Sequence, residues 1–140
     1  MAVTSIWAVH RSIKDALDYA ANPDKTENPN EEDLRRLMDY AENPDKTEQR
    51  YLISGVNCLP ELAYERMMET KRRYGKYGGI VAYHGYQSFK PGEVTPEQCH
   101  ALGVELAKRL WGDKYEVLIA SHRDHEHLHN HFILNSVSFK

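Results

Sequence analysis

The segment HRDHEHLHNHF, residues 122–132, carries five histidines and two acids within eleven residues. Side chains alternate between the two faces of a β-strand, so His127, His129 and His131 are expected on one face. If His122 ends the preceding strand and pairs with His129, its imidazole joins the same face. Three or four neutral imidazoles that converge in this way form a ligand set for a divalent metal ion.

The two acids of this segment are candidates for orienting the histidines of the predicted metal site. Asp124 and Glu126 fall in the expected turn, where a carboxylate could accept the second N–H of a ligand histidine. A ligand set made of histidines alone leaves coordination positions open, which favours a catalytic metal over a structural one. The alternative is a solvent-exposed, histidine-rich strand that holds no ion.

Alternating strand and helix patterns must position these histidines. The patterns predict an α+β domain with a largely antiparallel five-stranded sheet and helices packed on its faces. The short turn before the last strand predicts an antiparallel hairpin. The strands are expected at residues 2–10, 50–58, 78–89, 114–122 and 128–139, and the helices at 12–22, 30–43, 60–75 and 95–112.

The helix expected at 95–112 has the clearest boundaries. Thr95 and Gln98 form a capping-box pattern, Pro96 occupies the first position, and Gly112 ends the helix. We expect its apolar face to pack against the sheet. That face is predicted to consist of Leu102, Val104, Leu106, Ala107 and Leu110.

Composition limits the class of protein. The length of 140 residues and an apolar fraction of 41% suit one globular domain, expected over residues 1–140. The net charge of −3 disfavours a general nucleic-acid coat protein. Cys58 and Cys99 lack metal or redox spacing and are expected to be reduced, buried thiols. No spanning run and no signal pattern occur, so we expect a cytoplasmic protein with no membrane partner.

The end of the chain also resembles a known family. HRDHEHLHNHFILNSVSF is similar to the third motif of MobA-type plasmid and transposon mobilization relaxases, a branch of the HUH endonucleases. The resemblance implies that His122, His129 and His131 hold Mg²⁺ or Mn²⁺ against a scissile phosphate. It leaves His127 as a competing third ligand or as a group that helps deprotonate a tyrosine, and Asp124 resembles the orienting acid.

In this family a tyrosine near the N-terminus attacks single-stranded DNA. ALDYAANPDKT resembles the first motif and points to Tyr19 as the nucleophile. LDYAANPDKTE recurs 21 residues later as MDYAENPDKTE, which makes Tyr40 the rival. The alternative for each is an ordinary tyrosine at or near a helix surface.

Two further segments are expected to contact DNA. AYHGYQSFKPGE resembles the second motif and points to Ser88, although a serine at a strand end is commonly a turn residue. His84 lies on the same strand, and a structural histidine is an equally good interpretation. A basic segment interleaved with tyrosines suits a single strand, or is a solvated helix end. Its cations are Arg66, Lys71, Arg72, Arg73 and Lys76.

Together these features predict a relaxase that nicks one DNA strand at an origin of transfer through a 5′-phosphotyrosine, with accessory mobilization proteins as partners. Two alternatives remain: a metal-binding module without catalysis, and a metallonuclease that uses water and forms no covalent intermediate. Relaxases usually continue beyond this motif, so we expect the domain to be truncated at Lys140.

Overall fold

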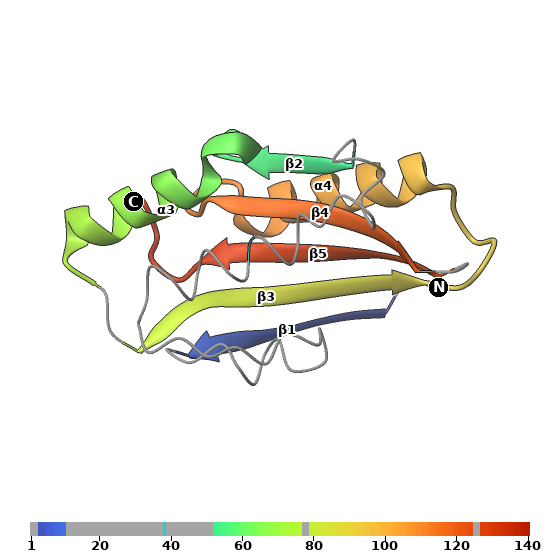
Figure 1. Cartoon of the computed structure of the whole chain (residues 1–140), viewed down its shortest axis with the longest axis horizontal. Helices are drawn as coiled ribbons and strands as arrows, with labels where there is room; N and C mark the ends of the chain where they lie inside the picture. Colours follow the sequence, from blue (N-terminus) through green and yellow to red (C-terminus); the bar gives the residue numbers. More distant parts are fainter. Residues whose placement is uncertain (1–2, 11–37, 39–51, 77–78, 125–126) are drawn as a thin grey trace.

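The protein has an α+β fold, as predicted, in a computed structural model that describes residues 3–10, 38, 52–76, 79–124 and 127–140. Five strands form one sheet, and the helices lie against it (Figure 1). The strands are β1 (Val3–His10), β2 (Ile53–Val56), β3 (Ile80–Phe89), β4 (Val117–Asp124) and β5 (His127–Asn135). The helices whose full extent lies within the described residues are η2 (Pro60–Leu62), a short 3-10 helix, α3 (Ala63–Tyr74) and α4 (Pro96–Trp111).

The strand order places the histidine-rich strand at the centre of the sheet. The order is β1-β3-β5-β4-β2, and every neighbouring pair is antiparallel. β5 therefore lies between β3 and β4 (Figure 1). Every residue of β5 from Leu128 to Asn135 is buried, because elements cover both faces of this strand.

The last two strands form the predicted hairpin. His122 of β4 lies directly opposite His129 of β5, and Ala120 lies opposite His131. Directly paired residues of antiparallel strands project on the same face of the sheet. The prediction that His122 joins the face of His129 and His131 is therefore confirmed.

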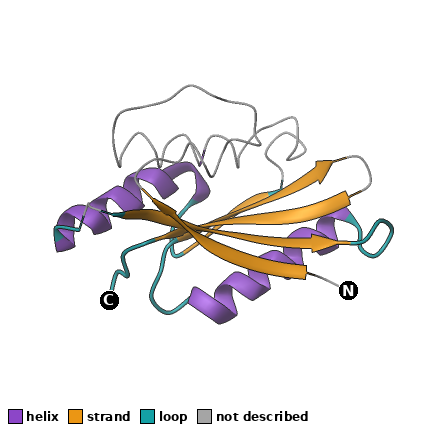
Figure 2. Ribbon diagram, turned by 90° about the horizontal axis from the view of Figure 1, so that it is seen from below, coloured by secondary structure: helices purple, strands orange, loops and turns teal. Residues whose placement is uncertain are grey.

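The two long helices cover opposite faces of the sheet (Figure 2). Met67 and Met68 of α3 pack with Leu118 and Ile133, on the face that carries the histidines. On the other face, Ala107 of α4 packs with apolar side chains of β4 and β5, among them Val117, Ile119 and Phe132. Within the described residues, neither helix combines the length and apolarity that a membrane crossing requires.

The predicted boundaries of α4 are confirmed, but its predicted apolar face is partly wrong. Thr95 and Gln98 form the capping box, whereas Leu102 and Leu110 are 43% and 54% exposed. The buried residues are Cys99, Gly103 and Ala107, spaced by four. These small side chains allow a close approach of the helix to the sheet, and the half-buried Val104 and Leu106 pack beside them, as predicted.

Some predicted elements lie partly or wholly outside the described residues. The helix predicted at 12–22 is outside them, and of the helix predicted at 30–43 only Met38 is described, as helical and buried. The last strand ends at Asn135, earlier than predicted. At that point the Asn135 amide donates to Met67 O and to Glu116 Oε1, which ties the end of β5 to α3 and to the start of β4.

Candidate metal centre

Three buried histidines gather at the β4–β5 hairpin. His122 comes from β4, and His129 and His131 come from β5. One ring nitrogen from each lies within 4.8 Å of the others. The hairpin register explains this arrangement, because it places His122 beside His129 and the two-residue strand period places His131 next along the same face.

This donor set fits a divalent metal ion. Three imidazole nitrogens bound to one ion at about 2.1 Å lie about 3.0–3.6 Å from one another. The observed separations of at most 4.8 Å therefore need to shorten by at most about 2 Å, which side-chain rotations can provide. Neutral imidazoles also leave the charge of a bound cation uncompensated, which suits an anionic ligand such as a phosphodiester.

A fourth histidine, His84 of β3, contacts one member of this group. Its Nε2 lies 2.8 Å from Nδ1 of His131, and both side chains are buried. Burial, and to a smaller extent the charge of His122, lower the pKa of His84 to about 4. His84 is therefore neutral at physiological pH, and its ring offers one donor and one acceptor nitrogen.

The direction of this hydrogen bond matters for metal binding. If His131 donates from Nδ1 to His84 Nε2, the proton of His131 is on Nδ1 and its Nε2 keeps a lone pair. The reverse direction would put the proton of His131 on Nε2. Ligand histidines commonly donate their second ring N–H to a neighbouring acceptor, which fixes the tautomer that binds. Only the first direction leaves the Nε2 atom of His131 able to bind a cation.

A buried polar network lies on the opposite face of the same strands. Ser121 donates to Asn130 Oδ1, and Asn130 Nδ2 donates at 2.9 Å to Gln87 Oε1 and to Cys99 O. Asn130 stands between His129 and His131 in the sequence, and Ser121 precedes His122. The network therefore joins β3, β4 and β5 at the level of the three clustered histidines.

His100 of α4 extends this network toward β2. Its ring contacts Ser54 Oγ at 2.6 Å and Ser121 Oγ at 2.7 Å, and burial lowers its pKa. This network was not predicted from the sequence. The signal that was available is a series of polar residues at positions that alternate with the histidines and face the helix.

The other residues predicted around the cluster occupy different positions. His127 begins β5 and is exposed, and it is not part of the three-histidine group. Asp124 ends β4 opposite His127, but its side chain lies outside the described part, as do Tyr19 and Tyr40. Ser88 of β3 is half-buried and pairs with His129, so it lies on the histidine face.

The prediction that Lys71 contacts DNA is wrong in this structure. Its side chain is fully buried, and its Nζ donates to Val81 O at 2.9 Å and to Ser136 Oγ at 2.8 Å. The ammonium group joins α3 to the beginning of β3 and to the segment after β5. It is therefore not available to a phosphate.

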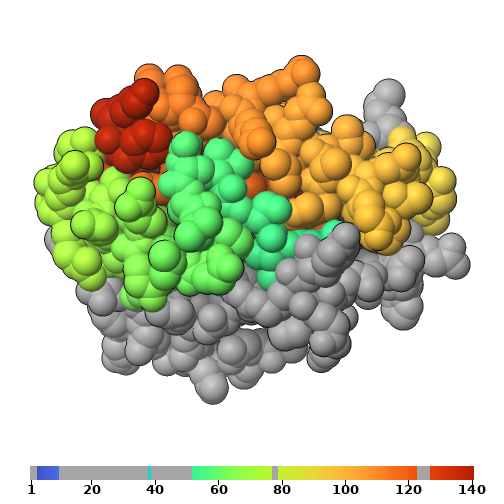
Figure 3. Space-filling model, turned by 90° about the horizontal axis from the view of Figure 1, so that it is seen from above, coloured from blue at the N-terminus to red at the C-terminus, as the bar shows by residue number. Residues whose placement is uncertain are grey.

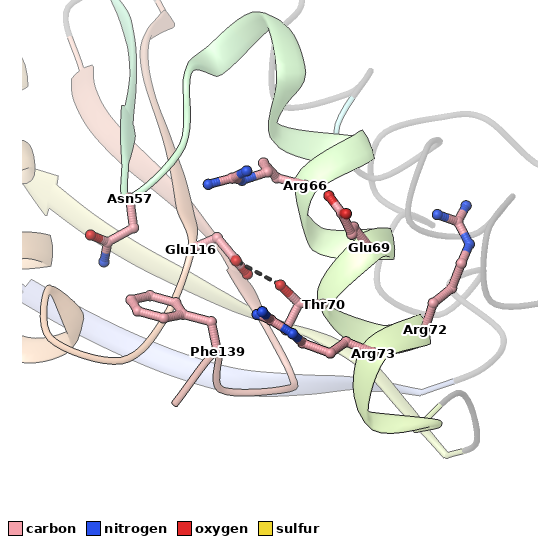
Figure 4. Close-up of a pocket in the computed structure, with 8 residues that line it drawn as sticks. All are labelled: Asn57, Arg66, Glu69, Thr70, Arg72, Arg73, Glu116 and Phe139. Atoms are coloured by element: carbon pink, nitrogen blue, oxygen red, sulfur yellow. Dashed lines mark hydrogen bonds between the residues drawn. The ribbon is translucent and has the colours of Figure 1, made fainter.

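The remaining cations of the basic segment are exposed: Arg66 lies near the start of α3, Arg72 and Arg73 lie in its last turn, and Lys76 follows the helix. Arg66 and Arg73 point from this helix toward Glu116, whereas Arg72 turns away (Figure 4). They line a pocket of about 740 Å³ between α3, the start of β4 and the end of the chain, which lie side by side at the surface (Figure 3). The other lining residues are Asn57, Glu69, Thr70 and Phe139.

This basic pocket is not close to the histidines. Lys71, which precedes Arg72 and Arg73 in the last turn of α3, contacts Val81 at the beginning of β3. His129 lies opposite Ser88, near the end of that strand. Seven residues of strand separate Val81 from Ser88, which is about 23 Å. The predicted DNA contacts thus lie at two ends of the sheet.

The comparisons with known proteins agree on one family. Residues 40–140 match the family described as "Relaxase: MobA/VirD2-like, nuclease domain". A protein named "Protein rlx" from Staphylococcus aureus is 46% identical over 87 residues, which are 62% of this chain and 27% of that protein. Another protein of that name and species is 40% identical over 62% of this chain and 26% of its own length.

A third relative extends over nearly the whole chain. The "Group II intron-interrupted relaxase LtrB" of Lactococcus lactis subsp. cremoris (strain MG1363) is 32% identical over 99% of this chain and 30% of its own length. The chain thus spans between a quarter and a third of the length of these relatives. No solved structure matches the chain significantly. Because the family match covers well over half of the sequence, the chain belongs to the MobA/VirD2-like relaxase family, in its nuclease domain.

Proposed function

We propose that this chain nicks one strand of DNA at an origin of transfer, by metal-assisted attack of a tyrosine on a phosphodiester. The observation that carries the proposal is the buried group of His122, His129 and His131 in a relaxase nuclease domain. These three imidazoles would hold Mg²⁺ or Mn²⁺. An ion bound there would withdraw charge from a non-bridging phosphate oxygen and stabilise the anionic transition state.

Tyr19 is our proposed nucleophile, with Tyr40 as its rival. A phenol has a pKa near 10, so it needs a group that takes its proton at neutral pH. The exposed imidazole of His127 at the start of β5 is the proposed acceptor. Asp124, its partner in the strand register, is proposed to orient it.

The proposed reaction exchanges one phosphodiester for another. The phenolic oxygen forms a bond to phosphorus while the bond from phosphorus to the 3′ oxygen breaks. The 3′ oxygen leaves with a proton as a free hydroxyl, and the 5′ phosphate stays on the tyrosine. The number of phosphate ester bonds is unchanged, so the 3′ hydroxyl can reverse the step without a nucleotide cofactor.

The remaining assignments are proposals of the same kind. Ser88 beside His129 is proposed to position the strand near the cleaved bond, and Arg66, Arg72, Arg73 and Lys76 to bind phosphates farther along it. We further propose that this is a single nicking domain, that it acts in the cytoplasm, and that accessory mobilization proteins bring it to its DNA.

A covalent-adduct assay tests this function. The protein is incubated with Mn²⁺ and single-stranded oligonucleotides that contain candidate origins of transfer, and DNA-linked protein is detected by its retarded migration under denaturing conditions. We expect an adduct that Tyr19→Phe abolishes and Tyr40→Phe retains. His129→Ala should also abolish it, because the cation loses a ligand.

Other outcomes of this assay would support the alternatives. An adduct lost only in Tyr40→Phe would move the nucleophile to that residue. Cleavage with no adduct in any variant would indicate hydrolysis by a water molecule. A protein that binds Mn²⁺ and neither cleaves nor links DNA would be a metal-binding module, and the proposed function would be wrong.

A further inference from the structure

Trp7 has an unusual position on the edge strand β1. It is 37% exposed, although tryptophan side chains are highly buried on average. Trp7 pairs directly with His84 of β3, and the two rings lie 4.8 Å apart between centroids at an angle of 40°. The indole therefore lies on the same face of the sheet as the metal-ligand histidines and is partly open to solvent.

The indole of Trp7 lies close to the candidate metal centre. The centroid of His84 lies 5.0 Å from that of His131. Trp7 and His131 both contact the His84 ring, so their ring centres lie within about 10 Å of each other. Successive nucleotides of a stacked strand rise by about 3.4 Å, so this distance corresponds to about three nucleotides.

We propose that Trp7 is a stacking platform for a nucleobase of the single-stranded DNA, within about three nucleotides of the phosphate at the His122–His129–His131 group. The inference rests on the proposed function and adds a base subsite to it. Aromatic rings bind the bases of single strands by stacking, with little preference for sequence. Trp7 would therefore hold the strand in register at the reactive phosphate and leave sequence recognition to other residues.

The chemistry at this position favours a base over a phosphate. Trp7 offers a flat apolar surface and a single N–H donor. Its described ring neighbour is the imidazole of His84, so both sides of this contact are aromatic rings. The arginines of the basic segment line a separate pocket, and they are the proposed phosphate contacts.

The two tryptophans of the chain make a direct test possible. Trp111 packs edge-on against Phe132 on the α4 face, with ring centroids 5.8 Å apart. In a Trp111→Phe background, Trp7 is the remaining tryptophan, and its fluorescence is excited selectively at wavelengths that tyrosine does not absorb. The probes are a twelve-nucleotide oligothymidylate and an abasic oligonucleotide of the same length, which carries the same phosphates and no bases.

We expect the oligothymidylate to quench the fluorescence of Trp7 and the abasic probe to leave it unchanged. Trp7→Leu should weaken binding of the oligothymidylate by about 5- to 150-fold, the usual range for one stacked base. Binding of the abasic probe should not change. Trp7→Phe should restore part of the affinity, because a ring remains, whereas Ile6→Ala, at the exposed neighbouring position on the other face, should have no effect.

The outcomes separate this inference from the proposed function. Equal affinity of wild type and Trp7→Leu for the oligothymidylate would overturn the stacking role and leave the nicking function intact. Equal losses for both probes would also overturn it, because a general loss of structure does not depend on bases. If neither probe binds wild type, the stacking inference is wrong, and the covalent-adduct assay decides the proposed function separately.

Discussion

At the scale of single residues, the contact between His84 and His131 decides which nitrogen His131 offers to a bound ion. His84 is completely buried and neutral, so its ring can accept a hydrogen bond from Nδ1–H of His131. A leucine at position 84 cannot accept a hydrogen bond. A glutamine can, through its side-chain oxygen.

His84→Leu is therefore expected to lower the affinity for Mn²⁺ by about 10- to 100-fold, the usual effect of removing the partner of a ligand histidine. His84→Gln should lose clearly less affinity for Mn²⁺, because the hydrogen-bond acceptor remains. Isothermal titration calorimetry measures both, and Tyr83→Phe on the other face of β3 is the control. Equal losses in the two His84 variants would mean that packing, and not the hydrogen bond, determines the affinity.

The sequence predicted part of this site for a clear reason. His122, His129 and His131 come from one hairpin, so strand alternation and a tight turn are enough to bring them together. His84 and Trp7 join the site through β3 and β1, and no local pattern says that β3 lies beside β5. Lys71 was assigned to the surface because lysine is rarely buried without a partner.

At the scale of elements, α4 packs against the strands that carry the histidines, on the face opposite to the imidazoles. A Cβ atom added at Gly103 would lie 2.5 Å from Nδ2 of Asn130, the residue between His129 and His131. Gly103→Ala should therefore force α4 away from β5 and destabilise the fold by about 1–3 kcal/mol, as overpacking does in other cores. Thermal or urea unfolding measures the change.

The control for this variant is Leu102→Ala. The sequence pattern predicted that Leu102 would face the sheet, but it is 43% exposed. Its truncation should change the free energy of unfolding by no more than about 0.5 kcal/mol, as is usual at the surface. If Leu102→Ala costs more than Gly103→Ala, the packing described for α4 is wrong.

The buried ammonium group of Lys71 joins helix α3 to the sheet. Burial lowers the pKa of Lys71 to about 8, although the nearby Glu116 carboxylate raises it. The unfolded chain keeps the usual value near 10.4. Between these values the unfolded state binds more protons than the folded state, so the free energy of unfolding should rise as the pH increases from about 8 to about 10.

The rise is measurable as a difference between wild type and Lys71→Met. The lowered pKa of Lys71 corresponds to at most about 3 kcal/mol in the free energy of unfolding. Below pH 8 the difference in this free energy between the two proteins should not vary with pH. Urea unfolding at several pH values measures it. If Lys71→Met and wild type have parallel profiles from pH 7 to pH 10, the ammonium is not desolvated as the structure indicates.

At the scale of the whole molecule, a net charge of −3 means that DNA affinity must come from local surfaces. The exposed arginines of α3 are the proposed surface. Each phosphate contact to a single strand contributes about −0.7 to the slope of log affinity against log salt. Replacing Arg66, Arg72 and Arg73 with glutamine should therefore reduce the magnitude of that slope by about 2.

Fluorescence anisotropy with a labelled single strand measures this slope. Arg109→Gln removes a cation that is paired with Glu105 on α4, and it should leave the slope unchanged. An unchanged slope in the triple variant would mean that the basic segment is only a solvated helix end. The pattern of charges could not decide between these interpretations, because both place the arginines at the surface.

The fold class could be predicted from periodicity and capping, whereas the order of the strands could not. β3 pairs with both β1 and β5, and β2 pairs with β4 at the far edge. These pairings join segments far apart in the sequence and depend on the packing of both helices. They determine that Trp7, His84 and the hairpin histidines share one face, while the basic pocket lies at the other end of the sheet.

The most direct test of the account is an anomalous-scattering experiment on crystals grown with Mn²⁺. We expect one strong anomalous peak coordinated by ring nitrogens of His122, His129 and His131, with His127 outside the coordination sphere. A peak held by His127 in place of His122, or no peak among these rings at saturating Mn²⁺, would contradict the central claim.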